Sequence, residues 1–280
     1  MELIQNVEID SGSENPIRAD IYISNLPGPK PVVIFNHGFK GFKDWGYWHL
    51  LGKKFAEQGS IFIKFNQSHN GMSVKDIDQF SRLDLFAVNT YSREKQDLKA
   101  VTDWLFNNSF IPYSYINQQR IALLGHSRGG TMALHFGSQN PKITHIVSWA
   151  AYHNYENRFM QPQYDMWDDK QTVYIPNGRT GVDMPQHISI YHDYRNHKDE
   201  LSIKNSVSTS RKPILIVHGT EDAVVQFQEA IDIKSYNPEI ELYLVPNADH
   251  VFGGKHPWNE TQLPEYAQFA FDKTLAFLKK

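Results

Sequence analysis

The chain has 280 residues, of which 40% are hydrophobic and 21% charged, and its 28 basic and 31 acidic side chains give a net charge of -3. This composition is typical of a globular protein with one large core, and the near balance of charge excludes an electrostatic reason for binding nucleic acid or an anionic membrane. The absence of cysteine excludes disulfides, thiolate metal sites and a cysteine nucleophile. We expect a small neutral or weakly charged ligand.

The amino terminus, MELIQNVEIDSGSENP, has neither the basic segment nor the apolar segment of a signal peptide, and no later apolar run approaches the length of a membrane span. The sequence therefore predicts a soluble, cytoplasmic protein with no membrane partner.

Several short segments have the patterns of β-strands. Residues 3–10 and 17–24 alternate apolar and polar side chains, which predicts an antiparallel hairpin. The following runs are continuously apolar or β-branched, as expected of strands buried on both faces. They are PVVIFNHG (31–38), IFIKFN (61–66), RIALLGH (120–126), ITHIVSWA (143–150), PILIVHG (213–219) and IELYLVP (240–246).

Helical patterns lie between these strands. In residues 92–107 the apolar side chains Leu98, Val101 and Leu105 form one stripe of a helix. Similar helices are expected at about 47–58, 128–138, 225–236 and 264–279. Alternating strands and helices predict an α/β protein with a parallel sheet covered by helices on both faces.

One interval, from about Ala151 to Arg211, breaks this alternation and is rich in aromatic residues. A structureless loop of that length is improbable in a compact domain. We interpret residues 151–211 as an inserted cap with short elements, including a hairpin formed by TVYIPNG (172–178) and HISIYHDY (187–194), and residues 1–150 and 212–280 as the main domain.

The segment LGHSRGG places Ser127 between Gly125 and Gly129, directly after a buried strand and before a helix. In a G-x-S-x-G turn the small flanking residues leave the serine hydroxyl exposed on a sharp bend, where it can act as a nucleophile. The alternative is an ordinary glycine-rich turn before a helix of a parallel sheet, without a catalytic role. The motif alone does not exclude this alternative.

Two further loops at strand ends supply partners for such a serine. Asp222 follows the strand in PILIVHGTED, and His250 follows the next strand in IELYLVPNADH. The order Ser127, Asp222, His250 is the Ser…Asp/Glu…His order of one known arrangement of the catalytic triad. Charge alone does not exclude Glu221 as the acid.

The stretches HGF, GHSRGG, HGTEDAVV and NADH make the chain resemble the α/β-hydrolases over residues 30–279. The resemblance implies a mostly parallel eight-stranded sheet, the nucleophile turn after its fifth strand, and Asp222 rather than Glu221 as the acid. An oxyanion hole would use the backbone N–H of Arg128, because it follows the nucleophile, and by resemblance that of Phe39. In the loop FNQSHNGMS, Ser68, Asn70 and Gly71 stand where other members have arginine and glycines.

An insertion after the sixth strand and a compact HGF loop resemble the cinnamoyl and feruloyl esterases and dienelactone hydrolase-like carboxylesterases. The resemblance implies cleavage of a small carboxylic ester with an aromatic or short acyl group, through an acyl-enzyme and without a cofactor. The chain has thirteen histidines, but the spacing of His187, His192 and His197 does not favour a metal site. Two alternatives stay open: a prolyl-oligopeptidase-like peptidase, and a binding protein that keeps the fold without chemistry.

Overall fold

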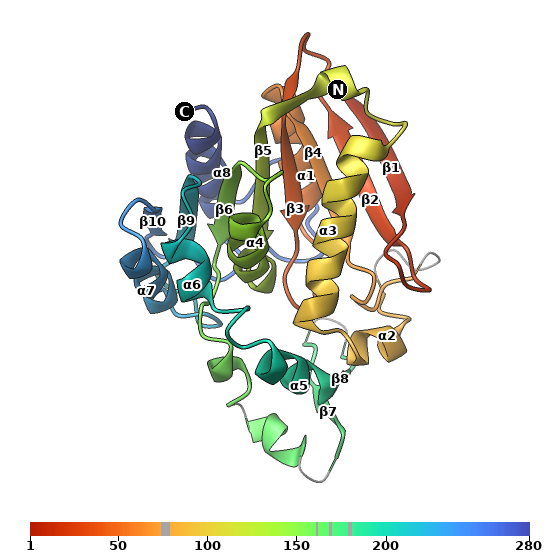
Figure 1. Cartoon of the computed structure of the whole chain (residues 1–280), viewed down its shortest axis with the longest axis vertical. Coiled ribbons are helices and arrows are strands. Elements are labelled where there is room, and N and C mark those ends of the chain that lie inside the picture. Colours follow the sequence, from red (N-terminus) through yellow and green to blue (C-terminus); the bar gives the residue numbers. More distant parts are fainter. Residues whose placement is uncertain (74–78, 161, 168–169, 179–180) are drawn as a thin grey trace.

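The structure, a computed structural model, describes residues 1–73, 79–160, 162–167, 170–178 and 181–280. An eight-stranded sheet has the strand order β1-β2-β4-β3-β5-β6-β9-β10 (Figure 1). The pairs β1–β2 and β2–β4 are antiparallel and all other neighbours are parallel. Its strands are β1 (Glu2–Ile9), β2 (Ile17–Ile23), β3 (Lys30–Asn36), β4 (Ile61–Asn66), β5 (Ile116–His126), β6 (His145–Trp149), β9 (Ile214–Gly219) and β10 (Glu241–Val245).

Helices cover both faces of this sheet, as the buried strands require. In Figure 1 α3 and α4 lie in front of the sheet, and α1 and α8 lie behind it. The α-helices are α1 (Trp48–Glu57), α2 (Leu83–Ala87), α3 (Tyr91–Asn107), α4 (Arg128–Gln139), α5 (Ser189–Asn196), α6 (Ile203–Ser208), α7 (Gln228–Tyr236) and α8 (Glu265–Leu278). Each face has its own hydrophobic core.

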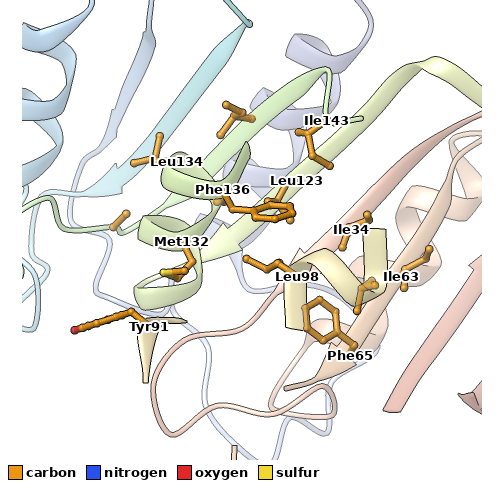
Figure 2. Close-up of a cluster of buried hydrophobic side chains, with 14 of the residues drawn as sticks. Ile34, Ile63, Phe65, Tyr91, Leu98, Leu123, Met132, Leu134, Phe136 and Ile143 are labelled. Atoms are coloured by element: carbon orange, nitrogen blue, oxygen red, sulfur yellow. The ribbon is translucent and has the colours of Figure 1, made fainter. Parts of the chain in front are cut away.

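The alternation of side chains along β3 shows how one strand serves both cores. Ile34 belongs to the core under α3 and α4, whereas Phe35 belongs to the core under α1 and α8. Figure 2 shows the first core, where Leu98 of α3 and Phe136 of α4 pack beside Leu123 of β5. A strand buried on both faces has few positions for polar side chains, which is why these runs are mostly apolar in the sequence.

The segment between β6 and β9 forms the cap. It contains the 3₁₀ helices η2 (Glu156–Arg158) and η3 (Pro162–Trp167), an antiparallel pair of strands, β7 (Thr172–Ile175) and β8 (Met184–His187), and the helices α5 and α6. In Figure 1 the strands β7 and β8 and helix α5 lie at the bottom of the molecule. The prediction of a strand over residues 187–194 is wrong: α5 begins at Ser189, and its buried side chains Ile190 and Tyr194 are one helical turn apart.

The predicted fold class, a mostly parallel eight-stranded sheet with helices on both faces and an insertion after the sixth strand, is confirmed. The short helix α2 had no counterpart in the sequence prediction. Within the described ranges no helix is both long enough and apolar enough to span a membrane.

Candidate active site

Ser127 occupies a strained turn between the end of β5 and the start of α4. Its φ of 55° and ψ of -122° are backbone angles that an L-residue rarely adopts. The two flanking glycines permit this turn: a Cβ at Gly125 would lie 2.0 Å from the carbonyl oxygen of Gly129, and a Cβ at Gly129 would lie 2.2 Å from the carbonyl oxygen of Asn36. The backbone segments around Ser127 thus pack too closely for a side chain at Gly125 or Gly129, and the strained turn holds the side chain of Ser127 clear of them.

The structure brings Ser127, His250 and Asp222 into one hydrogen-bonded series. The distance from Ser127 Oγ to His250 Nε2 is 3.0 Å, and His250 Nδ1 lies 2.7 Å from Asp222 Oδ2. A carboxylate only accepts hydrogen bonds, so Nδ1 of His250 carries the proton and Nε2 is free to accept one from the serine hydroxyl. This is the geometry that general-base activation of a serine requires.

The buried carboxylate of Asp222 is held in its charged form by several donors. Its Oδ1 accepts hydrogen bonds from the backbone N–H groups of Val224 at 2.9 Å and Val225 at 2.8 Å. Burial works against ionisation, but the hydrogen bonds from His218 and His250 outweigh it and hold the pKa of Asp222 well below its usual range. Glu221, the alternative acid, is exposed.

His218 also contacts the carboxylate of Asp222, and the sequence analysis did not predict this contact. Its Nε2 lies 3.2 Å from Asp222 Oδ2 and 2.8 Å from the carbonyl oxygen of Val225, and its side chain is fully buried. His218 is the first residue of the HGTED stretch that the sequence analysis uses to locate Asp222. The four-residue spacing does not by itself predict that the imidazole of His218 contacts the carboxylate of Asp222.

The loop after β3 passes directly beside the nucleophile turn. A Cβ at Gly38 would lie 3.0 Å from Cβ of Ser127, so Phe39 and Ser127 are near neighbours. Within the described part of the chain, neither the N–H of Phe39 nor that of Arg128 has a backbone or side-chain acceptor. Two unpaired donors beside a serine hydroxyl can stabilise the negative charge that develops on a carbonyl oxygen under attack.

A buried network of charges anchors this loop to the sheet, and no pattern in the sequence predicts it. Lys43 of the loop and Lys64 of β4 each donate a hydrogen bond of 2.8 Å to Oδ2 of Asp20 on β2, and both also contact Asp44. Removing one partner of a buried ion pair is strongly destabilising, so this network fixes the loop that carries Phe39.

Two other histidines beside the site are buried and neutral. Nε2 of His126 donates a hydrogen bond of 2.7 Å to the carbonyl oxygen of His250, and burial together with the nearby His250 lowers the pKa of His126 to about 3. Nδ1 of His37 lies 2.9 Å from the carbonyl oxygen of Gly38, and burial lowers the pKa of His37 to about 4. His37 is thus a strand-end histidine bonded to backbone.

The loop after β4, in which Ser68 and Asn70 depart from the family pattern, is held by hydrogen bonds to α3 and to His37. Ser68 donates its hydroxyl and its N–H to the carboxylate of Asp97 on α3, at 2.9 and 2.8 Å. Asn70 donates to Nε2 of His37 at 3.3 Å. Ser68 is therefore fixed to α3, and Asn70 contacts the loop that carries Phe39.

Two cavities lie beside the serine, and both are bordered by Ser127 and His250. The smaller one, of about 130 Å³, lies against Trp45, Trp48 and His126. The larger one, of about 360 Å³, reaches the cap and is lined by Phe39, Tyr152, Tyr164, Ile175 and Val224, among others. An ester has two halves on either side of its carbonyl, and this arrangement offers a compartment to each. Within the described residues no cluster of three or more His, Asp or Glu side chains is arranged to hold a metal ion.

The strained nucleophile turn after the fifth strand of a mostly parallel sheet is the arrangement of the α/β-hydrolases. Residues 87–274 match the prolyl oligopeptidase family, and the chain belongs to this family of serine hydrolases. No curated protein sequence matches the chain.

Solved structures with the same fold come from several hydrolases. Est1E from Butyrivibrio proteoclasticus with bound ferulic acid has a TM-score of 0.73 at 17% identity, over 98% of this chain and 100% of the other. The α/β-hydrolase GrgF from Penicillium sp. sh18 has a TM-score of 0.73 at 17% identity, over 100% and 98%. A putative dipeptidyl aminopeptidase IV from Bacteroides ovatus has a TM-score of 0.66 at 12% identity, over 99% of this chain but 35% of the other.

Proposed function

We propose that this protein cleaves carboxylic esters with an aromatic or short acyl group, through an acyl-enzyme intermediate on Ser127. The observation that carries the proposal is the hydrogen-bonded series from Ser127 through His250 to Asp222, with the serine raised on a strained turn beside two unpaired N–H groups.

The chemistry follows from this geometry. Oγ of Ser127 attacks the ester carbonyl while His250 Nε2 takes the hydroxyl proton, and Asp222 stabilises the imidazolium that forms. The N–H groups of Phe39 and Arg128 hold the oxyanion. When the tetrahedral intermediate collapses, the bond to the alkoxy group breaks and His250 returns the proton to the departing alcohol. A water then attacks the acyl-enzyme by the same steps, which releases the acid and restores the serine.

A peptidase is the second candidate, and the family match is the observation that favours it. The esterase is supported by the comparison of lengths, because Est1E matches this chain over its whole length whereas the putative aminopeptidase matches over about a third of its own. The larger cavity also supports the esterase, because no carboxylate among its described lining residues is available to bind the ammonium group of a peptide.

The test is labelling of the purified protein with a fluorophosphonate, followed by a panel of p-nitrophenyl esters, hydroxycinnamate esters and peptidyl p-nitroanilides. We expect labelling and ester hydrolysis in the wild type and neither in Ser127→Ala. Ser208→Ala, an exposed serine on α6, is the control and keeps both. Amide hydrolysis faster than ester hydrolysis would favour the peptidase, and an unlabelled, folded wild type would refute both candidates.

A further inference from the structure

Three cationic side chains border the larger cavity beside Ser127: Lys40, Arg128 and Arg158. They come from the loop after β3, from the first turn of α4 and from η2 in the cap, so they converge only in the folded chain. Among the described residues that line this cavity there is no Asp or Glu. Three like charges around one cavity repel one another unless an anion joins them.

Two of these cations, Lys40 and Arg158, have no acidic partner among the described residues. Nη1 of Arg158 donates a hydrogen bond of 3.2 Å to the carbonyl oxygen of Val224, and its Nε has no acceptor among the residues that the structure describes. Nζ of Lys40 donates one of 3.0 Å to the carbonyl oxygen of Pro176. No ion pair joins either side chain to a carboxylate in the described part of the chain. Glu156, the acid nearest to Arg158 in sequence, pairs instead with Lys198.

Arg128 is held from behind and only partly satisfied. Its guanidinium carbon lies 4.1 Å from the centre of the Phe39 ring and 5.3 Å from that of Tyr91, so it is enclosed by aromatic faces. One contact of 3.4 Å joins it to Glu94, and its Nε, although buried, has no hydrogen-bond acceptor in the described ranges of the chain. Buried donors without acceptors are rare in folded proteins and mark positions where a ligand can supply one.

We propose that the part of the ester that fills this cavity carries a carboxylate. The inference rests on the proposed ester hydrolysis at Ser127 and names its substrate class. Arginine presents parallel N–H donors that match a carboxylate, and such charge-assisted hydrogen bonds are stronger than neutral ones. The apolar lining from Phe39, Ile175 and Val224 suits the carbon chain between the ester and the distal carboxylate.

The test uses isosteric pairs of substrates that differ by one charge. In the first arm the carboxylate is in the acyl half: the p-nitrophenyl monoester of adipic acid is compared with the p-nitrophenyl ester of adipic acid monoamide. In the second arm it is in the leaving group: 3-carboxyphenyl acetate is compared with 3-carbamoylphenyl acetate. The readout is the ratio of kcat/KM for the carboxylate to that for the amide.

We expect a ratio of about 10 or more in at least one arm at low salt, falling as sodium chloride is added, because a charge-assisted hydrogen bond contributes at least about a factor of ten in binding. The arm that shows the preference identifies which half of the ester enters the cavity. Arg158→Gln and Lys40→Gln should each lower that ratio about tenfold.

Arg195→Gln is the matched control, because Arg195 is also a cap arginine beside a tyrosine ring but lies outside this cavity. It leaves the ratio unchanged. Ratios near 1 or below in both arms, with hydrolysis that depends on Ser127, overturn the inference alone. A preference that both cavity variants retain also overturns it. Failure to hydrolyse any of the four esters, with Ser127 unlabelled, instead refutes the proposed function on which the inference rests.

Discussion

Acidification from pH 7 to pH 5 should destabilise this protein steeply, because three buried histidines are neutral in the folded state. Burial lowers the pKa of His37 to about 4, that of His126 to about 3 and that of His135 to about 4, each from 6.5. All three are almost inaccessible to solvent. In the unfolded chain the same side chains take up protons as the pH falls below 6.5, whereas the folded chain binds none until about pH 4.

The magnitude follows from the linkage between proton binding and folding. The stability that a neutral buried histidine contributes is fully present above pH 6.5 and is lost as the pH falls towards its folded pKa. For an unfolded pKa of about 6.5 and a folded pKa of about 4 or less, each histidine costs about 2 kcal/mol of the free energy of unfolding between pH 7 and pH 5. Three together cost about 5 to 6 kcal/mol, which is comparable with the whole stability of many domains. Burial raises the pKa of Glu94 and that of Asp97, which offsets part of this loss.

The assay is urea unfolding at pH 7, 6 and 5 for the wild type and two variants. His135 is the histidine to replace, because it lies on α4 and contacts Ser206 and Gln139, away from the cavities beside Ser127. His135→Asn should remove about 2 kcal/mol of the pH 7 to pH 5 loss, whatever its stability at pH 7. His192→Asn, at an exposed position, should leave the loss unchanged. Equal losses in His135→Asn and the wild type would refute the reasoning.

Gly129→Ala should cost at least about 3 kcal/mol or prevent folding, because its Cβ would lie 2.2 Å from a backbone carbonyl oxygen, whereas Gly178→Ala, with no atom within 4 Å, should change the unfolding midpoint little. Equal midpoints for the two variants would contradict this. Asp222→Asn should keep the fold but lower kcat for p-nitrophenyl acetate by about four orders of magnitude, since an amide no longer selects the productive tautomer of the histidine; a loss below tenfold would show that the acid is elsewhere. Asp20→Asn should destabilise the chain by about 3 kcal/mol in urea, because Lys64 loses the buried carboxylate that it shares with a second lysine. A change below 1 kcal/mol would mean that water or another acid replaces it.

Local patterns in the sequence predict the sheet, its helices and the strand ends that carry Ser127, Asp222 and His250. They do so because a doubly buried strand must be continuously apolar, and because residues that follow parallel strands gather at one edge of the sheet. The failure at residues 187–194 has the same origin. HISIYHDY alternates like a strand, but Ile190 and Tyr194 are also one helical turn apart, and only packing in the cap decides between the two periods.

Contacts that depend on distant segments leave no such pattern. Arg158 borders the cavity with Lys40 although 118 residues separate them, and neither has a sequence neighbour that marks it as part of a site. His218 and the network around Asp20 are similar cases, because their contacts form only when the chain folds and no local pattern marks them.

The cap joins the sheet at the end of β6 and the start of β9. These junctions separate a segment whose sequence can change from the strands whose positions must stay fixed. β6 pairs with β5 on one side and with β9 on the other, so the strands that precede Ser127 and Asp222 are held in register by hydrogen bonds that do not involve residues 151–212. Insertions, deletions or exchanges in that segment would thus change the lining that Tyr152, Tyr164 and Ile175 give to the larger cavity and leave Ser127 and Asp222 in place. A graft of another cap between Ala150 and Pro213 is therefore a way to change the substrate of the proposed ester hydrolysis.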